Sequence, residues 1–96
     1  MMFDNERDVT RGVMDSLEIP IQIFLWEIID KLEGEKDYLQ VFELKQIGED
    51  RIKIIHSQEV PGYRREYIIR GQIEKNLKIF AIDSGEYSTL LKSSEY

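Results

Sequence analysis

The sequence predicts an α+β domain in which one main helix packs on a mostly antiparallel sheet of about five strands. Residues 20–34 alone show the 3.6-residue apolar period of a sizeable helix. The other apolar residues fall in short runs rich in aromatic and β-branched side chains, with turn residues between them. Short turns favour antiparallel pairing, and one helix is too few for the crossovers of a doubly wound parallel sheet.

The first predicted element is a short strand at residues 9–14 (VTRGVM). Pro20 then begins the helix, because a proline in the first turn removes no helical hydrogen bond, and Gly34 ends it. At 100° per residue from Ile21, Gln22 lies on the solvent side. The predicted core face comprises Phe24, Leu25, Ile28 and Leu32, with Ile29 at its margin.

Four consecutive strands linked by hairpins are predicted after the helix, at residues 38–46, 51–58, 63–70 and 77–83. Pro61-Gly62 is a strong turn signal between the second and third of them. Residues 71–76 continue the third strand past a bulge or form a loop. Residues 87–91 form an edge strand or one helical turn, and residues 93–96 are expected to be frayed.

Length and composition indicate a single domain, residues 1–96. Of its 96 residues, 42% are hydrophobic and 33% are charged, and the net charge is −6. The absence of cysteine excludes disulfides, thiol nucleophiles and zinc–thiolate sites. The N-terminal residues lack the pattern of a signal peptide, and no apolar run is long enough to span a bilayer. We therefore expect a cytoplasmic protein that does not bind membranes.

His56 is the only histidine and the one candidate for acid–base chemistry. Period-two alternation places it on the face of Ile52 and Ile54, where we expect a half-buried or rim position. Ser57 points to the opposite face, and no sequence motif supplies a triad. Residues 83–86 (DSGE) lack the ligand spacing of a calcium loop, and no glycine-rich phosphate motif occurs. We therefore assign no catalytic, metal or cofactor-binding residue and expect no cofactor.

The third predicted strand interleaves arginine with tyrosine, which is a candidate anion or ligand surface. Such a strand can contact phosphates and stack bases. The acidic net charge opposes nucleic-acid binding, so we expect none. The other interpretation is a solvated sheet surface on which the arginines pair with Glu59 or Glu66. The candidate residues are Tyr63, Arg64, Arg65, Tyr67 and Arg70.

Ile23 and Trp26 form a second apolar patch on the helix, opposite its predicted core face. One interpretation is a contact site for a partner protein or a second copy of the chain. The other is that the segment around Phe3, or residues 87–91, folds over this patch.

Several segments together resemble a known family. They are FDNERDVTRGV, FLWEIIDKL, DYLQVFELK, KIIHSQEVPGYRREY and STLL. The chain resembles, over nearly its whole length, the domain of unknown function family numbered 960, small proteins of Gram-positive bacteria and their phages. The resemblance implies a cytoplasmic bacterial protein and supplies no activity, cofactor or site residue.

Three functional hypotheses follow from these observations. The first is a noncatalytic protein-interaction module, with a homodimer as one form, that binds through the Ile23 and Trp26 patch or through the sheet surface. The second is a binder of a small ligand or single-stranded nucleic acid that uses residues 63–70. The third is a small enzyme that uses His56.

Overall fold

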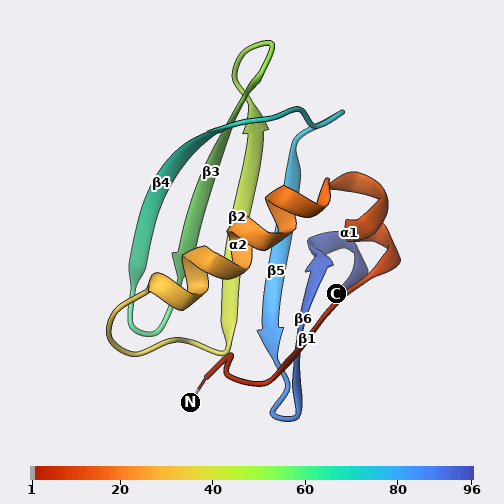
Figure 1. Ribbon diagram of the computed structural model, residues 1–96. Coiled ribbons are helices and arrows are strands. Elements are labelled where there is room, and N and C mark those ends of the chain that lie inside the picture. Colours follow the sequence, from red (N-terminus) through yellow and green to blue (C-terminus); the bar gives the residue numbers. More distant parts are fainter. Residues whose placement is uncertain (1) are drawn as a thin grey trace.

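The computed structural model describes residues 2–96, in which helix α2 crosses one face of a six-stranded sheet (Figure 1). The strands are β1 (Glu6–Val9), β2 (Leu39–Gln46), β3 (Arg51–Gln58), β4 (Tyr63–Arg70), β5 (Leu77–Asp83) and β6 (Tyr87–Lys92). The helices are α1 (Arg11–Ser16), α2 (Ile19–Lys31) and a final 3₁₀ helix (Ser93–Glu95). None of the described helices is long and apolar enough to cross a membrane.

The strand order is β1-β6-β5-β2-β3-β4. The predicted α+β class is confirmed, but the sheet has six strands instead of about five, and β1 pairs with β6 in parallel. The expected hairpin between β4 and β5 is wrong, since β5 pairs with β2. Residues 71–76 connect β4 to β5 across the sheet. The Gln46 side chain binds this connection: it accepts a hydrogen bond from the Ile73 N–H (2.9 Å) and donates one to the Gly71 carbonyl (3.2 Å).

The predicted strand at residues 9–14 is wrong, because the chain leaves β1 at Val9 and enters α1. Thr10 caps this helix, and its hydroxyl accepts the Val13 N–H (3.3 Å). Val13 and Leu17, four residues apart, are both buried in the core. The segment is too short for its apolar spacing to distinguish a strand from a helix. The Thr10 cap and the burial of Val13 and Leu17 favour the helix.

Helix α2 confirms Pro20 in its first turn but ends at Lys31, before Gly34. Its predicted core residues are buried, except that Phe24 is only partly buried against the core. Two predictions are wrong. Ile29 is fully buried, not marginal, and Gln22 is buried and donates to the Leu17 carbonyl (2.8 Å). The buried arc is wider than predicted because the end of α1 contacts Gln22 through the Leu17 carbonyl and the Met14 sulfur (3.5 Å), and Arg7 of β1 lies over Trp26.

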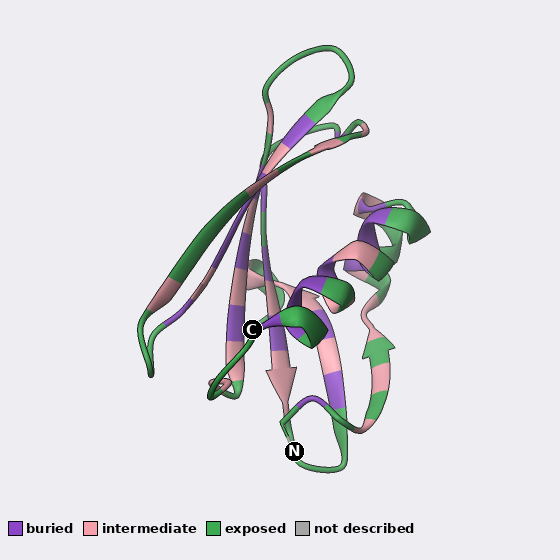
Figure 2. Ribbon diagram, turned by 60° about the vertical axis from the view of Figure 1, so that its left-hand side comes forward, coloured by how far each residue is buried: buried purple, intermediate pink, exposed green. Residues whose placement is uncertain are grey.

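Buried positions alternate with more exposed ones along the central strands (Figure 2). The buried residues form one cluster with those of α2, so the inner face of the sheet, toward α2, carries most of the core. Its fully buried apolar residues are Phe42, Leu44, Ile52, Ile54, Ile79, Ala81 and Leu90. Alternation along the strands directs the intervening residues to the opposite, outer face. Neither α1 nor α2 lies on the outer face (Figure 1).

The C-terminal segment is ordered differently from the prediction. Strand β6 lies inside the sheet between β5 and β1, so it is neither an edge strand nor a helical turn. The expected fraying is also wrong, since Glu95 lies in the 3₁₀ helix and accepts from the Thr10 hydroxyl (2.8 Å) and the Lys92 N–H (2.8 Å).

Candidate functional site

Strand β4 divides its arginines and tyrosines between the two faces of the sheet. Arg65 pairs in register with buried His56, so it lies on the inner face. Tyr63 and Tyr67 share that face by alternation, whereas Arg64 and Arg70 lie on the outer face. The five candidate residues therefore do not form one continuous platform for stacked bases.

The three inner residues of β4 face α2 across a cavity of about 230 Å³, which we call the α2–β4 cleft. Its lining residues are Phe24, Glu27, Ile28, Lys31, Leu32, Tyr63, Arg65 and Tyr67. The Phe24 and Tyr67 rings meet edge to face with centroids 5.8 Å apart. The Arg65 guanidinium lies 5.3 Å from the Tyr67 ring centroid. Burial raises the pKa of Tyr67, while Arg65 acts in the opposite direction, so its hydroxyl is neutral at neutral pH.

His56 is fully buried, which corrects the predicted half-buried or rim position. Its ring stacks on Phe42 with centroids 4.8 Å apart and meets the edge of Tyr63 at 5.6 Å. Its Nε2 lies 2.5 Å from the Gln40 Oε1. Burial lowers the pKa of His56 to about 4, so the ring is neutral at pH 7.

A buried network of amides orients this histidine. The Gln40 amide nitrogen donates to the Gln58 Oε1 (2.7 Å) and to the Asp37 carbonyl (2.8 Å), so its oxygen is the acceptor for His56. Gln58 in turn donates to the carbonyls of Glu35 (3.1 Å) and Pro61 (2.9 Å). Within residues 2–96, His56 Nδ1 is the one buried side-chain nitrogen or oxygen without a hydrogen-bond partner. Amide partners orient the ring but activate no nucleophile.

Sequence reasoning missed Gln40 and Gln58, although a signal for them exists. Each is a polar residue that shares the inward face of its strand with two apolar residues, Phe42 and Leu44 on β2 and Ile52 and Ile54 on β3. Such residues need buried hydrogen-bond partners, which for these two are the histidine ring and nearby backbone.

The Ile23 and Trp26 patch is only partly open. Ile23 is 51% exposed, whereas Trp26 is partly buried and packs against the core. The Arg7 guanidinium lies 4.8 Å from the Trp26 ring centroid, and Arg7 also pairs with Asp30. Phe3 is buried as well. The N-terminal segment thus covers Trp26 and leaves Ile23 accessible.

The outer face of the sheet carries a cluster of apolar residues on its middle strands and charged residues at both edges. The partly buried apolar residues of β2, β5 and β6 are Leu39, Val41, Phe80, Ile82 and Leu91. Ile55 of β3 and exposed Ile68 of β4 also lie on this face, as do the charged residues Glu43, Lys45 and Lys78 of β2 and β5. The β3–β4 end carries Arg51, Lys53, Arg64 and Arg70, and the β1 edge carries Glu6 and Asp8. Glu66 pairs with Arg64 (2.8 Å), so one of the two candidate carboxylates binds an arginine, although within β4 and not across strands as predicted; its cross-strand partner is Lys53 (3.0 Å).

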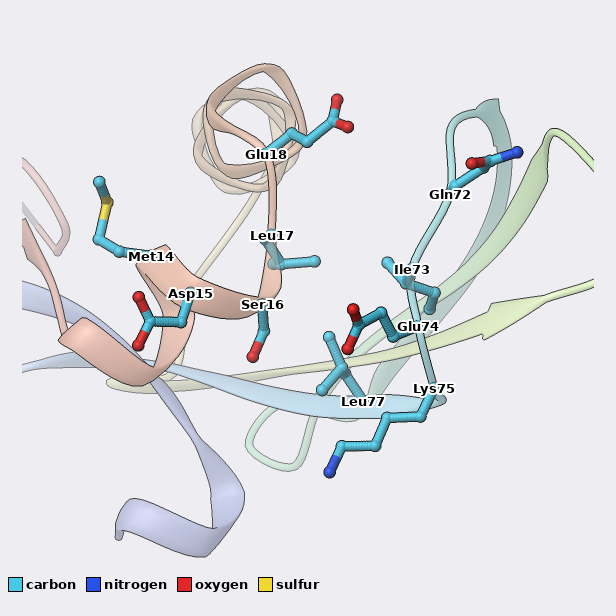
Figure 3. A pocket seen from close by; sticks show the side chains of 10 residues that line it. All are labelled: Met14, Asp15, Ser16, Leu17, Glu18, Gln72, Ile73, Glu74, Lys75 and Leu77. Atoms are coloured by element: carbon cyan, nitrogen blue, oxygen red, sulfur yellow. The ribbon is translucent and has the colours of Figure 1, made fainter.

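A further hollow, of about 260 Å³, lies between the α1–α2 junction and residues 72–77 (Figure 3). Leu17, Ile73 and Leu77 point toward one another inside it. Carboxylates from three segments and one lysine line its rim, namely Asp15, Glu18, Glu74 and Lys75. The described residues contain no group of three or more histidine or carboxylate side chains placed to hold a metal ion. The sequence does not predict this hollow because the β4–β5 crossover creates it.

Comparison with known proteins gives one family and one fold neighbour to report. A model of the family described as staphylococcal protein of unknown function (DUF960) matches residues 6–95. A crystal structure of a protein of unknown function from Enterococcus faecalis has 24% sequence identity and a TM-score of 0.85, over 97% of this chain and 92% of that chain. This likeness shows the shared fold. A search of curated proteins finds no match.

Proposed function

We propose that this chain, which belongs to the DUF960 family of staphylococcal proteins of unknown function, is a noncatalytic, cytoplasmic protein-interaction module. Its outer sheet face binds a second copy of the chain. One observation carries the proposal: the outer sheet face, which neither α1 nor α2 covers, has a row of apolar residues on its middle strands and opposite charges at its two edges. The Tyr96 ring of the same chain meets Phe80 in this row, with centroids 5.5 Å apart, and leaves the rest of the row open.

The apolar residues of this face are contiguous. Val41 pairs in register with Phe80, and Phe80 pairs with Leu91, so their side chains form a row across three neighbouring strands. Leu39 and Ile82 form the adjacent pair. Single exposed apolar residues are ordinary on a protein surface, but a contiguous patch indicates a contact site.

The charges of the outer face favour a second copy as the occupant. β4 and β1 are the two edges of the sheet. The outward charged side chains of β4 and its neighbour β3 are four basic residues and Glu66, whereas those of β1 are Glu6 and Asp8. Two copies can pack with their outer sheet faces together, related by a two-fold axis that lies between the sheets and runs parallel to the strands. This symmetry places the β4 edge of one copy against the β1 edge of the other. Each dimer then contains this contact twice, with the apolar rows in the middle.

Phe80→Glu is expected to abolish self-association, because it puts a charge into the middle of the apolar row. The wild-type protein should sediment as a dimer at high concentration and dissociate on dilution. The variant should sediment as a monomer throughout the same dilution series. Ile47→Glu is the matched control, since Ile47 is 48% exposed and lies outside strand β2, and it should leave the dimer intact.

Charge reversal tests the orientation of the two copies. Arg64→Glu with Arg70→Glu should weaken the dimer, as should Glu6→Lys with Asp8→Lys, and all four changes in one chain should restore it. A wild-type chain that sediments as a monomer at every concentration contradicts the proposal. A dimer lost on Ile23→Ser but kept in Phe80→Glu moves the interface to the Ile23 and Trp26 patch of α2.

A further inference from the structure

We propose that the α2–β4 cleft binds a small molecule with a single flat apolar ring and one anionic group, either a carboxylate or a phosphate. This inference concerns the inner side of the sheet and is independent of the proposed dimer. It rests on the size of the cavity, the aromatic side chains that line it and two cations among its lining residues.

The walls of the cleft match a flat apolar ring. Phe24 and Tyr67 are already edge to face, and Tyr63 extends the aromatic lining along β4. Ile28 and Leu32 supply the aliphatic surface from α2. The cavity, at about 230 Å³, is smaller than the roughly 300–1,000 Å³ of sites for drug-sized ligands. It therefore suits a ligand with one ring.

Two cations select an anionic group on that ligand. Arg65 comes from β4 and Lys31 from α2, so they approach the cleft from its two sides. Among the described residues, neither forms an ion pair, whereas Arg64 on the opposite face of the same strand is paired with Glu66. Glu27 is the one carboxylate in the lining, and it disfavours a second anionic group on the ligand.

Contacts behind the cleft position its β4 side. The Tyr63 ring meets the ring of His56, which is hydrogen-bonded to Gln40, and Gln40 is hydrogen-bonded to Gln58. A wall that is ordered before binding reduces the entropy lost when a ligand binds. The buried amide network therefore has a role in ligand binding that needs no chemistry at His56.

Titration of the ¹⁵N-labelled protein with three probes tests the inference: phenyl phosphate, phenylacetate and benzyl alcohol. At least one of the anionic probes should give saturable chemical-shift changes confined to the cleft, with an affinity about tenfold or more above that of the uncharged alcohol. Comparison of the two anionic probes then identifies phosphate or carboxylate as the preferred group.

Arg65→Ala should weaken the preferred probe about tenfold, because it removes the charge-assisted contact and leaves the ring contacts in place. Arg64→Ala is the matched control on the adjacent residue and should change the affinity less than twofold. Phe80→Glu, the variant designed to break the dimer, should bind like the wild type, so failure of one proposal is distinguishable from failure of the other.

Three results would overturn the inference. They are equal affinity for benzyl alcohol and both anionic probes, shift changes outside the cleft, and equal losses in Arg64→Ala and Arg65→Ala. The amide spectrum of each variant reports its folding, and Arg65→Lys provides a conservative second variant in which anion binding should be partly retained.

Discussion

Leu25→Ala is expected to lower the free energy of unfolding by about 2 to 5 kcal/mol, and Ile28→Ala by a similar amount. Both side chains are buried where α2 packs on the sheet, at 0% and 3% exposure. Truncation removes buried apolar surface and leaves a cavity in a close-packed core. Because the total stability of a domain is roughly 5 to 15 kcal/mol, either variant should be marginally folded. Urea denaturation monitored by circular dichroism measures the change.

The matched control is Ile23→Ala on the same helix, whose side chain is 51% exposed. It should change the stability by no more than about 0.5 kcal/mol. Ile29→Ala should behave like Leu25→Ala, because the fold buries Ile29 fully. A loss below about 1 kcal/mol for Leu25→Ala or Ile28→Ala would contradict the assigned orientation of α2.

Acidification from pH 7 to pH 5 is expected to destabilise the protein by about 2 kcal/mol through His56 alone. The pKa of His56 is about 4 in the fold, whereas that of an unfolded histidine is 6.5. The unfolded chain therefore takes up a proton as the pH falls through 6.5, and the folded chain does not until the pH approaches 4. Stability from this group is fully present above the unfolded pKa and is lost on acidification.

His56→Gln tests the assignment, since glutamine retains an N–H donor for the Gln40 oxygen but does not titrate. Urea melts at intervals from pH 7 to pH 5 should show a smaller slope of stability against pH in the variant. Burial raises the pKa of Asp83, but its hydrogen bonds together outweigh this effect and hold that pKa below its ordinary value. Hydrogen bonds also lower the pKa values of Glu66 and Glu95, so protonation of these three carboxylates affects stability mainly at lower pH. Parallel pH profiles for the two proteins would contradict the role of His56.

Local sequence signals determined most element boundaries. Residues 51–58, 63–70 and 77–83 are strands in the structure as predicted. Alternation of side chains, turn residues and the proline at position 20 act between near neighbours in the chain, so these signals are readable in the sequence itself. The interleaving of arginine with tyrosine identified five candidate residues on this strand, and three of them, Tyr63, Arg65 and Tyr67, form one wall of the cleft.

Tertiary structure decided which elements are neighbours. Pairing of β5 with β2 brings the 71–76 connection across the sheet, and packing of α1 and β1 beside α2 buries Gln22 and covers Trp26. The cleft likewise joins distant parts of the chain, because its second wall lies on α2. The same holds for the hydrogen bonds that link His56, Gln40 and Gln58. Pairing and burial depend on surfaces that exist only after the core has assembled, so local periodicity does not encode them.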